Sequence, residues 1–72
     1  MNKKELLKKF GLNVKFARMK KGLTQEKFAE LMGVHPTYIG KIETGNINMS
    51  LAKILVLAQT LGIDINKLLY IE

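Results

Sequence analysis

The chain has 72 residues, which is enough for one domain with a modest hydrophobic core and too few for a second domain. It contains no cysteine and one histidine, which excludes disulfides, a thiolate metal site, a thiol nucleophile and a zinc centre built from histidine. The net charge is +6 and the isoelectric point is near 9.8, so we expect an anionic partner, of which nucleic acid is the commonest large example in a cytoplasm.

The positive charge is concentrated in the first third of the chain. Eight Lys or Arg and a single Glu lie between residues 3 and 21, whereas the remainder is slightly acidic. A solvated, solubilising face explains these lysines equally well, so charge alone does not identify the partner. Lys8 and Lys9 directly follow Leu6 and Leu7, and no apolar stretch approaches the roughly 20 residues of a membrane span. We therefore expect a cytoplasmic protein with no signal peptide and no membrane partner.

Apolar residues spaced by three and four positions predict that the chain is helical throughout. In the first helix this spacing ends at Gly22, directly after Lys20 and Lys21. The stripe expected to face the core consists of Leu6, Phe10, Val14 and Ala17, with Leu7, Phe16 and Met19 beside it.

The second helix is short and ends in a tight turn. Thr24 is a suitable N-cap for it, and Phe28 and Met32 are among its apolar positions. Ala29 is small enough to let a following helix cross nearby, and Gly33 can adopt the left-handed backbone that the turn requires.

The third helix follows almost at once. Pro36 suits its first position, where the missing N–H would have no partner in any case, and this leaves His35 as the cap residue. Ile39 and Ile42 form its apolar side, and Gly45 closes it.

The fourth helix is strongly apolar, with Ser50 as its N-cap and Gly62 at its end, and Asp64 can cap one final helical turn. Its expected inward face is broad and comprises Leu51, Ile54, Leu55, Leu57, Ala58 and Leu61, while the final turn carries Leu68 and Leu69. The sequence therefore predicts an all-α fold of five helices.

Several short motifs resemble a known family. They are Gly22-Leu23-Thr24-Gln25, Phe28-Ala29, Met32-Gly33, Tyr38-Ile39, Ile42-Glu43 and Gly45, followed by Leu57-Ala58, Leu61-Gly62-Ile63 and Leu68-Leu69. Together they resemble the helix-turn-helix family of phage repressors, Cro proteins and bacterial XRE-type regulators, and residues 35–50 are similar to restriction–modification controller proteins.

This resemblance covers nearly the whole chain and implies both a fold and a function. The fold is one compact, lambda-repressor-like domain of five helices over residues 1–72, with a helix-turn-helix at about residues 24–44. The function is that of a transcription regulator, such as a repressor, that acts on double-stranded DNA. The third helix would enter the major groove, and a homodimer would bind a palindromic operator without any cofactor.

The resemblance also implies DNA-binding roles in and beside the third helix. Gln25, at the start of the second helix, would hold a phosphate. Thr37 and Lys41 have the reach to contact base edges. His35 and Pro36 would lie at the groove-facing end, although a cap and a helix-start proline account for both residues without any DNA contact.

Three further residues have two interpretations each. Tyr38 is either a phosphate contact or a ring packed into the protein. Asn46 and Asn48 either approach the DNA backbone or stabilise a turn through their own chain. Gly40 departs from the family, which often has a polar base-reading side chain there.

Arg18 and Glu43 are expected to form a largely buried ion pair between the first helix and the end of the third, because the family often pairs these positions. A catalytic role for Glu43 is not expected, since no second carboxylate or nucleophile recurs at a workable spacing. We therefore predict a protein without enzymatic activity.

Apolar residues near the carboxy terminus predict a dimer interface made of Val56, Ile65, Tyr70 and Ile71. In the alternative interpretation Tyr70 and Ile71 fold back on the first helix. The same four residues are also compatible with an antitoxin-like module that binds a different protein and uses the helix-turn-helix for autoregulation. A membrane-surface role for the basic first helix is not favoured, because its apolar residues are mostly those that a folded core needs.

Overall fold

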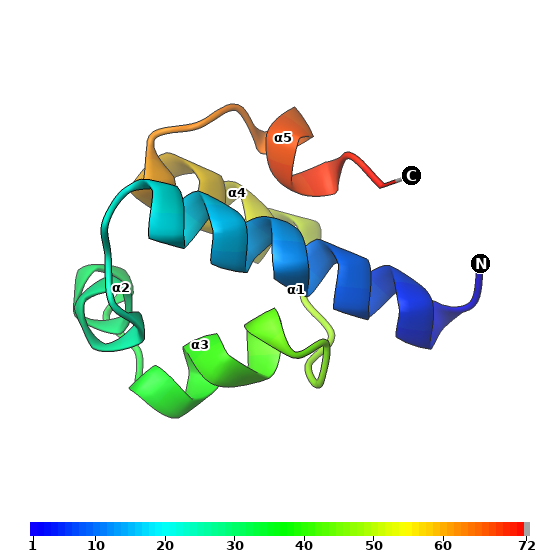
Figure 1. The fold of residues 1–72 in the computed structure, drawn as a ribbon, viewed down its shortest axis with the longest axis horizontal. Helices are drawn as coiled ribbons and strands as arrows, with labels where there is room; N and C mark the ends of the chain where they lie inside the picture. Colours follow the sequence, from blue (N-terminus) through cyan, green and yellow to red (C-terminus); the bar gives the residue numbers. More distant parts are fainter. Residues whose placement is uncertain (72) are drawn as a thin grey trace.

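The computed structural model describes residues 1–71, which form five helices and no strand (Figure 1). The helices are α1 (Lys3–Lys20), α2 (Gln25–Met32), α3 (Pro36–Glu43), α4 (Leu51–Leu61) and α5 (Ile65–Leu69). The predicted all-α class is thereby confirmed. No helix within residues 1–71 combines the length and the apolar character that crossing a membrane would require.

The long helix α1 organises the arrangement. It packs against α3 on one side and against α4 and α5 on the other, while α2 packs on α3 and α4 (Figure 1). Side chains from all five helices meet between them, and the buried hydrophobic cluster comprises Phe10, Val14, Phe28, Ala29, Ile39, Ile42, Leu57, Ala58, Leu61 and Leu68.

The helix starts follow the capping residues in the sequence. At each of the four predicted N-caps a side-chain acceptor receives a backbone N–H from two or three residues ahead, and these caps are Thr24, His35, Ser50 and Asp64. Asn2 caps α1 in the same way, because its Oδ1 accepts from the N–H of Glu5 at 2.8 Å. Such caps fix where each helix begins, since they satisfy N–H groups that have no intrahelical acceptor.

The turn between α2 and α3 depends on Gly33. Its φ of 70° lies in the left-handed region, and the N–H of Val34 donates to the carbonyl of Ala29 at 3.0 Å. This is the hydrogen bond that closes a helix when a left-handed glycine follows it. The chain therefore leaves α2 and enters α3 within three residues, as the sequence predicts.

Two expectations about α1 are wrong. Phe16 and Met19, placed beside the core stripe by the sequence, are 61% and 55% exposed, and Leu6 is exposed as well. Successive residues of a helix are rotated by about 100°, so Phe16 and Met19 lie on the side of α1 opposite to Phe10 and Val14. The core lies against only one side of α1, and it leaves Phe16 and Met19 at the surface. Leu6 is on the same side as Phe10, one turn earlier, where the buried cluster does not reach.

The inward face of α4 is narrower than predicted. Leu51 is 68% exposed and Leu55 is also exposed, whereas Leu57, Ala58 and Leu61 are buried. Helices α1, α2 and α5 pack against α4, whereas Leu51 and Leu55 border a hollow beside Ile65 and Leu69 that stays open to solvent. These two leucines therefore form an apolar surface.

Backbone contact between α1 and α3 requires glycine at position 11. A Cβ atom added to Gly11 would collide with the carbonyl oxygen of Ile42 and would lie 2.7 Å from that of Glu43. Gly40, in the middle of α3, offers a matched comparison, because a Cβ there would meet no atom within 4 Å.

We predict opposite effects on stability from alanine at these two positions. Gly11→Ala should lower the free energy of unfolding by about 1–3 kcal/mol, because two backbones must separate. Gly40→Ala should raise it by roughly 0.5–1 kcal/mol, because alanine favours the helix interior. Urea denaturation followed by circular dichroism measures both values, and equal midpoints would contradict the close approach of α1 and α3.

Candidate nucleic-acid interface

Helix α3 has a buried side and an open side. Ile39 and Ile42 are fully buried against α1 and α2, whereas Thr37 and Lys41, four residues apart, are exposed on the opposite side. The arrangement leaves a short helix whose outward side chains are a hydroxyl with a methyl group and a long ammonium. Both side chains are of types that contact base edges in a major groove.

The start of α3 is fixed by His35 and Pro36. The Nδ1 atom of His35 accepts from the backbone N–H of Thr37 at 3.1 Å, and Pro36 occupies the first helical position, half-buried. The capping role of the histidine is therefore present in the structure. Its ring is exposed, which leaves the Nε2 edge accessible at the same end of α3.

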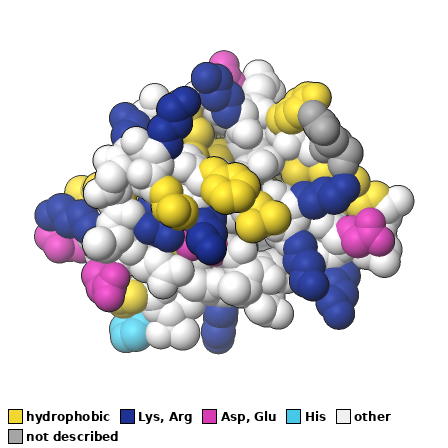
Figure 2. Space-filling view, in the orientation of Figure 1, with side chains coloured by type: hydrophobic (Ala, Val, Ile, Leu, Met, Phe, Trp, Pro, Cys, Tyr) yellow, Lys and Arg dark blue, Asp and Glu magenta, His cyan; other side chains and the backbone are white. Residues whose placement is uncertain are grey.

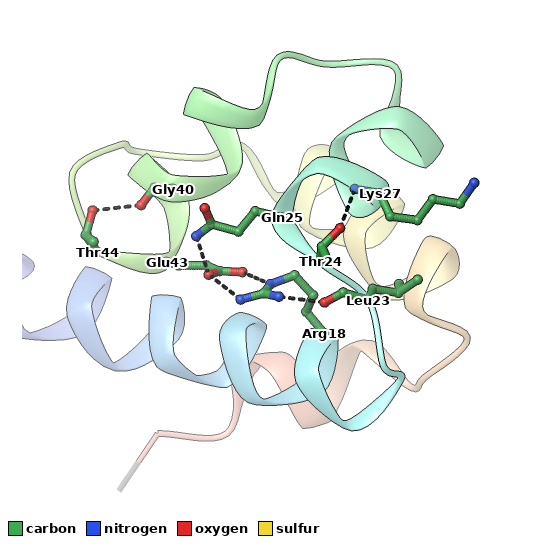
Figure 3. A network of polar contacts seen from close by, with 8 residues as sticks. All are labelled: Arg18, Leu23, Thr24, Gln25, Lys27, Gly40, Glu43 and Thr44. Atoms are coloured by element: carbon green, nitrogen blue, oxygen red, sulfur yellow. Dashed lines mark hydrogen bonds and ion pairs between the residues drawn. The ribbon is translucent and has the colours of Figure 1, made fainter.

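Arg18 and Glu43 lie together between α1 and α3 (Figure 3). The Nε atom of Arg18 is 2.6 Å from Oε2 of Glu43, and its Nη2 is 3.2 Å from Oε1. The two residues are 8% and 5% exposed. Nη1 of Arg18 also donates to the carbonyl of Leu23 at 2.6 Å, so one guanidinium joins the end of α1, the loop before α2 and the end of α3.

Gln25 belongs to the same network. Its Nε2 donates to Oε1 of Glu43 at 3.0 Å, and the residue is half-buried at the first position of α2 (Figure 3). One amide N–H therefore donates within the protein. The amide has a second N–H donor and a carbonyl acceptor in addition. The family resemblance implies a phosphate-binding role for Gln25, but it does not indicate that Glu43 orients the amide.

Tyr38 points away from the open side of α3. Its half-buried ring lines a hollow between α2, α3 and α4, and Nζ of Lys53 lies 5.9 Å from the ring centroid. Of the two interpretations from the sequence, the structure supports the packed ring.

Asn46 stabilises the end of α3. Its backbone N–H donates to the carbonyl of Lys41 at 2.8 Å, and its Nδ2 donates to Oγ1 of Thr44, which itself donates to the carbonyl of Gly40. This is a turn role of the kind expected for asparagine. Asn48 is exposed in the following loop.

Two lysines of α1 lie beside Gln25 and the end of α3. The sequence does not predict them as site residues. Lys8 and Lys15 line a hollow of about 340 Å³ that Gln25, Glu43 and Thr44 also line. Their spacing of seven residues places both on one side of a helix. The sequence counts them as positive charge, but only the packing of α1 against α3 shows which lysines adjoin the open side.

Comparison with known proteins identifies the family, because residues 14–68 match the family described as Helix-turn-helix. The chain belongs to the helix-turn-helix family. It is similar to control protein C.SmaI of Serratia marcescens, with 39% identity over 69 residues that cover 96% of this chain and 79% of the relative.

Solved structures agree with this assignment. The restriction-modification controller protein C.AhdI from Aeromonas hydrophila superimposes with a TM-score of 0.80 and 44% identity, covering 86% of this chain and 94% of that protein. The DNA-binding domain of BldD has a TM-score of 0.87 at 22% identity, covering 97% of this chain and all of that domain, which shows the shared fold. This helix-turn-helix protein is a DNA-binding transcription regulator and not an enzyme.

The four residues predicted to form the dimer interface do not lie together in this helix-turn-helix protein. Val56 borders the hollow that contains Tyr38, and Ile65 borders a second hollow beside α4. Tyr70 and Ile71 line a third hollow against α1. These side chains therefore border three separate hollows, and the interface that they were expected to form remains a prediction.

The carboxy-terminal segment folds back on α1, as the alternative interpretation from the sequence proposes. Nδ2 of Asn13 donates to the carbonyls of Leu68 and Tyr70 at 2.9 and 2.8 Å. Leu68 is fully buried and Ile71 is partly buried against the core, whereas the side chain of Tyr70 is largely exposed. These contacts hold the carboxy-terminal segment against α1.

We predict that the buried ion pair makes Arg18 far more important for stability than its neighbour Lys20. Arg18→Ala strands the carboxylate of Glu43 and should cost roughly 3–5 kcal/mol of unfolding free energy, whereas Lys20→Ala, at an exposed position, should cost about 0.5 kcal/mol or less. Chemical denaturation of the two variants gives the difference. Similar midpoints would show that the pair contributes nothing to holding α1, α2 and α3 together.

Proposed function

We propose that this regulator inserts α3 into the major groove of double-stranded DNA and reads base edges with Thr37 and Lys41. One observation carries the proposal: α3 is anchored by Ile39 and Ile42, while Thr37 and Lys41 on its other side are exposed. Their reach differs, since threonine offers a hydroxyl and a methyl group and lysine reaches guanine acceptors.

We propose that the start of α2 binds a DNA phosphate. The N–H groups of a first helical turn carry a partial positive charge, and Gln25 stands at that position with its amide oriented by Glu43. Lys8 and Lys15 lie around the same hollow and add attraction for the phosphate backbone. These contacts fix the position of the protein on the duplex and carry no sequence information of their own.

We propose a homodimer joined through the apolar surface of α4 and α5. Leu51, Ala52, Leu55, Ile65 and Leu69 line a hollow there, and no charged side chain is among them. A second copy is the occupant that such a surface suits, because a two-fold axis pairs the same apolar patch with itself. Of the four interface residues predicted from the sequence, Ile65 alone belongs to this surface.

A two-fold dimer has a consequence for the operator. It presents two copies of α3 to one side of the duplex, about 34–36 Å apart, so that palindromic half-sites repeat at about 10–10.5 base pairs or a multiple. Because the relatives C.SmaI and C.AhdI are named as control and restriction-modification controller proteins, we propose that this chain regulates the genes of a restriction–modification system.

Substitutions in the two parts of the DNA site should act differently. Thr37→Ala and Lys41→Ala should change base preference, with losses of about 1–3 kcal/mol on the preferred sequence and little on others. Gln25→Ala should weaken binding to all sequences alike. Selection from random DNA followed by titration on matched and mismatched operators measures these effects.

Lys53→Ala is the control for this experiment, since Lys53 lies over the Tyr38 ring and away from the open side of α3. Unchanged base preference in both Thr37→Ala and Lys41→Ala would contradict major-groove reading by these residues. A uniform loss in those variants would instead assign them to the phosphate backbone.

The proposed dimer surface is tested by two substitutions at sites of equal exposure. Leu55 and Val56 are adjacent on α4 and are 44% and 45% exposed, but only Leu55 lies on the proposed interface. Leu55→Glu should convert the dimer to a monomer, because it buries an unpaired carboxylate, whereas Val56→Glu should remain dimeric. Analytical ultracentrifugation distinguishes the two, and a monomeric wild-type chain or a monomeric Val56→Glu variant would contradict this interface.

A further inference from the structure

The outer side of α1 carries a stripe of large apolar side chains. Leu12, Phe16 and Met19 are all exposed, and their spacing of four and three residues places them on one side of the helix. Figure 2 shows hydrophobic side chains gathered across the middle of the face that α1 presents. We refer to these three residues as the α1 stripe.

Phe16 and Met19 belong to neither surface proposed above, whereas Leu12 also borders the hollow of Lys8, Lys15 and Gln25. The core is on the opposite side of α1, where Phe10 and Val14 are buried. The open side of α3 is formed by Thr37 and Lys41, and the proposed dimer surface belongs to α4 and α5. Scattered apolar residues are normal on a protein surface. Three exposed apolar side chains that adjoin on one side of a helix form a patch that a partner can bury.

Lysines border the α1 stripe on both sides. Lys8 and Lys15 each precede a stripe residue by four positions, and they lie on the flank next to α3. Lys9 and Lys20 lie on the other flank, three residues before Leu12 and four residues after Phe16. Figure 2 likewise shows Lys and Arg side chains around the central hydrophobic group. The one acidic residue of α1, Glu5, is in its first turn.

The stripe continues into a hollow. Leu12 and Phe16 line it together with Lys9, Asn13, Tyr70 and Ile71, and its volume is about 320 Å³. The hydrogen bonds from Asn13 to the carbonyls of Leu68 and Tyr70 hold its far wall against α1. The surface therefore offers an apolar ridge with a shallow hollow beside it.

We propose that the outer side of α1 docks an acidic amphipathic helix of another protein. The apolar side of such a helix would cover Leu12, Phe16 and Met19. Asp or Glu residues on its two edges would meet Lys8 and Lys15 on one flank and Lys20 on the other. Leu12 and Met19 are seven residues apart, so the ridge is about 10 Å long and matches two turns of a partner helix.

Charge complementarity selects this occupant over the others. A second copy seated on the same stripe would bring two sets of lysines together, which is unfavourable. Phosphates of DNA would pair with the lysines but would leave the apolar ridge in contact with charge.

The proposal is tested with the full chain and a fluorescent synthetic peptide. The probe is a helical peptide with leucine at positions i, i+4 and i+7 and glutamate on both edges. Two control peptides carry serine in place of leucine, or lysine in place of glutamate. Fluorescence anisotropy should show saturable binding of the acidic peptide. Each control peptide should bind with an affinity about tenfold lower or less.

Matched protein variants locate the site. Phe16→Ala combined with Met19→Ala should weaken binding of the acidic peptide about tenfold or more, while Leu31→Ala, on α2 and 53% exposed, should leave it unchanged. All three positions are exposed, and thermal melts verify that the variants fold. Shifts of ¹⁵N amide resonances on peptide addition should map to α1 and the carboxy-terminal segment.

Several outcomes would overturn the proposal. One is equal peptide binding by the double variant, and another is equal binding of the lysine-substituted peptide. Loss of operator affinity or of dimerisation in the double variant would assign the stripe to the DNA or dimer interface instead. Phe16-dependent binding to phosphatidylglycerol vesicles without binding of the acidic peptide would assign it to a lipid surface.

Discussion

The buried contact between Arg18 and Glu43 is the constraint on which the rest of the DNA-binding unit depends. One carboxylate accepts hydrogen bonds from the guanidinium at the end of α1 and from the amide of Gln25, and the same guanidinium holds the carbonyl of Leu23. A charge removed from water is stable only when it is paired and fully hydrogen-bonded. The positions of α1, α2 and α3 relative to one another are therefore coupled through a single polar cluster inside a small core.

Local chemistry is the part of this fold that the sequence predicts well. An N-cap acts through its own side chain on an N–H two or three residues away, so Thr24 and Ser50 mark helix starts without any knowledge of the tertiary structure. The left-handed turn at Gly33 is equally local. The pairing of Arg18 with Glu43 is not local, and it was expected only because the sequence resembles a family that often pairs these positions.

The exposed apolar side chains could not be assigned in this way. Helical periodicity gives the angle of Phe16 on α1 and of Leu55 on α4, but the arc that becomes buried depends on where the other helices lie. A chain of this size buries a limited fraction of its surface, so some apolar residues stay outside a core that is already full. The dependence on tertiary packing also explains why the sequence shows Lys8 and Lys15 only as positive charge, since they become neighbours of Gln25 when α1 packs against α3.

The absence of a side chain at Gly11 has a consequence for how the regulator can diversify. Because α3 rests on α1 through backbone atoms at Ile42 and Glu43, the seating of the helix does not depend on its outward residues. Thr37 and Lys41 are exposed, and substituting them leaves the backbone contact between α1 and α3 unchanged. In the proposed DNA-binding mode, base recognition and the packing of α3 are therefore separable properties. A descendant of this protein can acquire a new target sequence by one or two substitutions while keeping its stability.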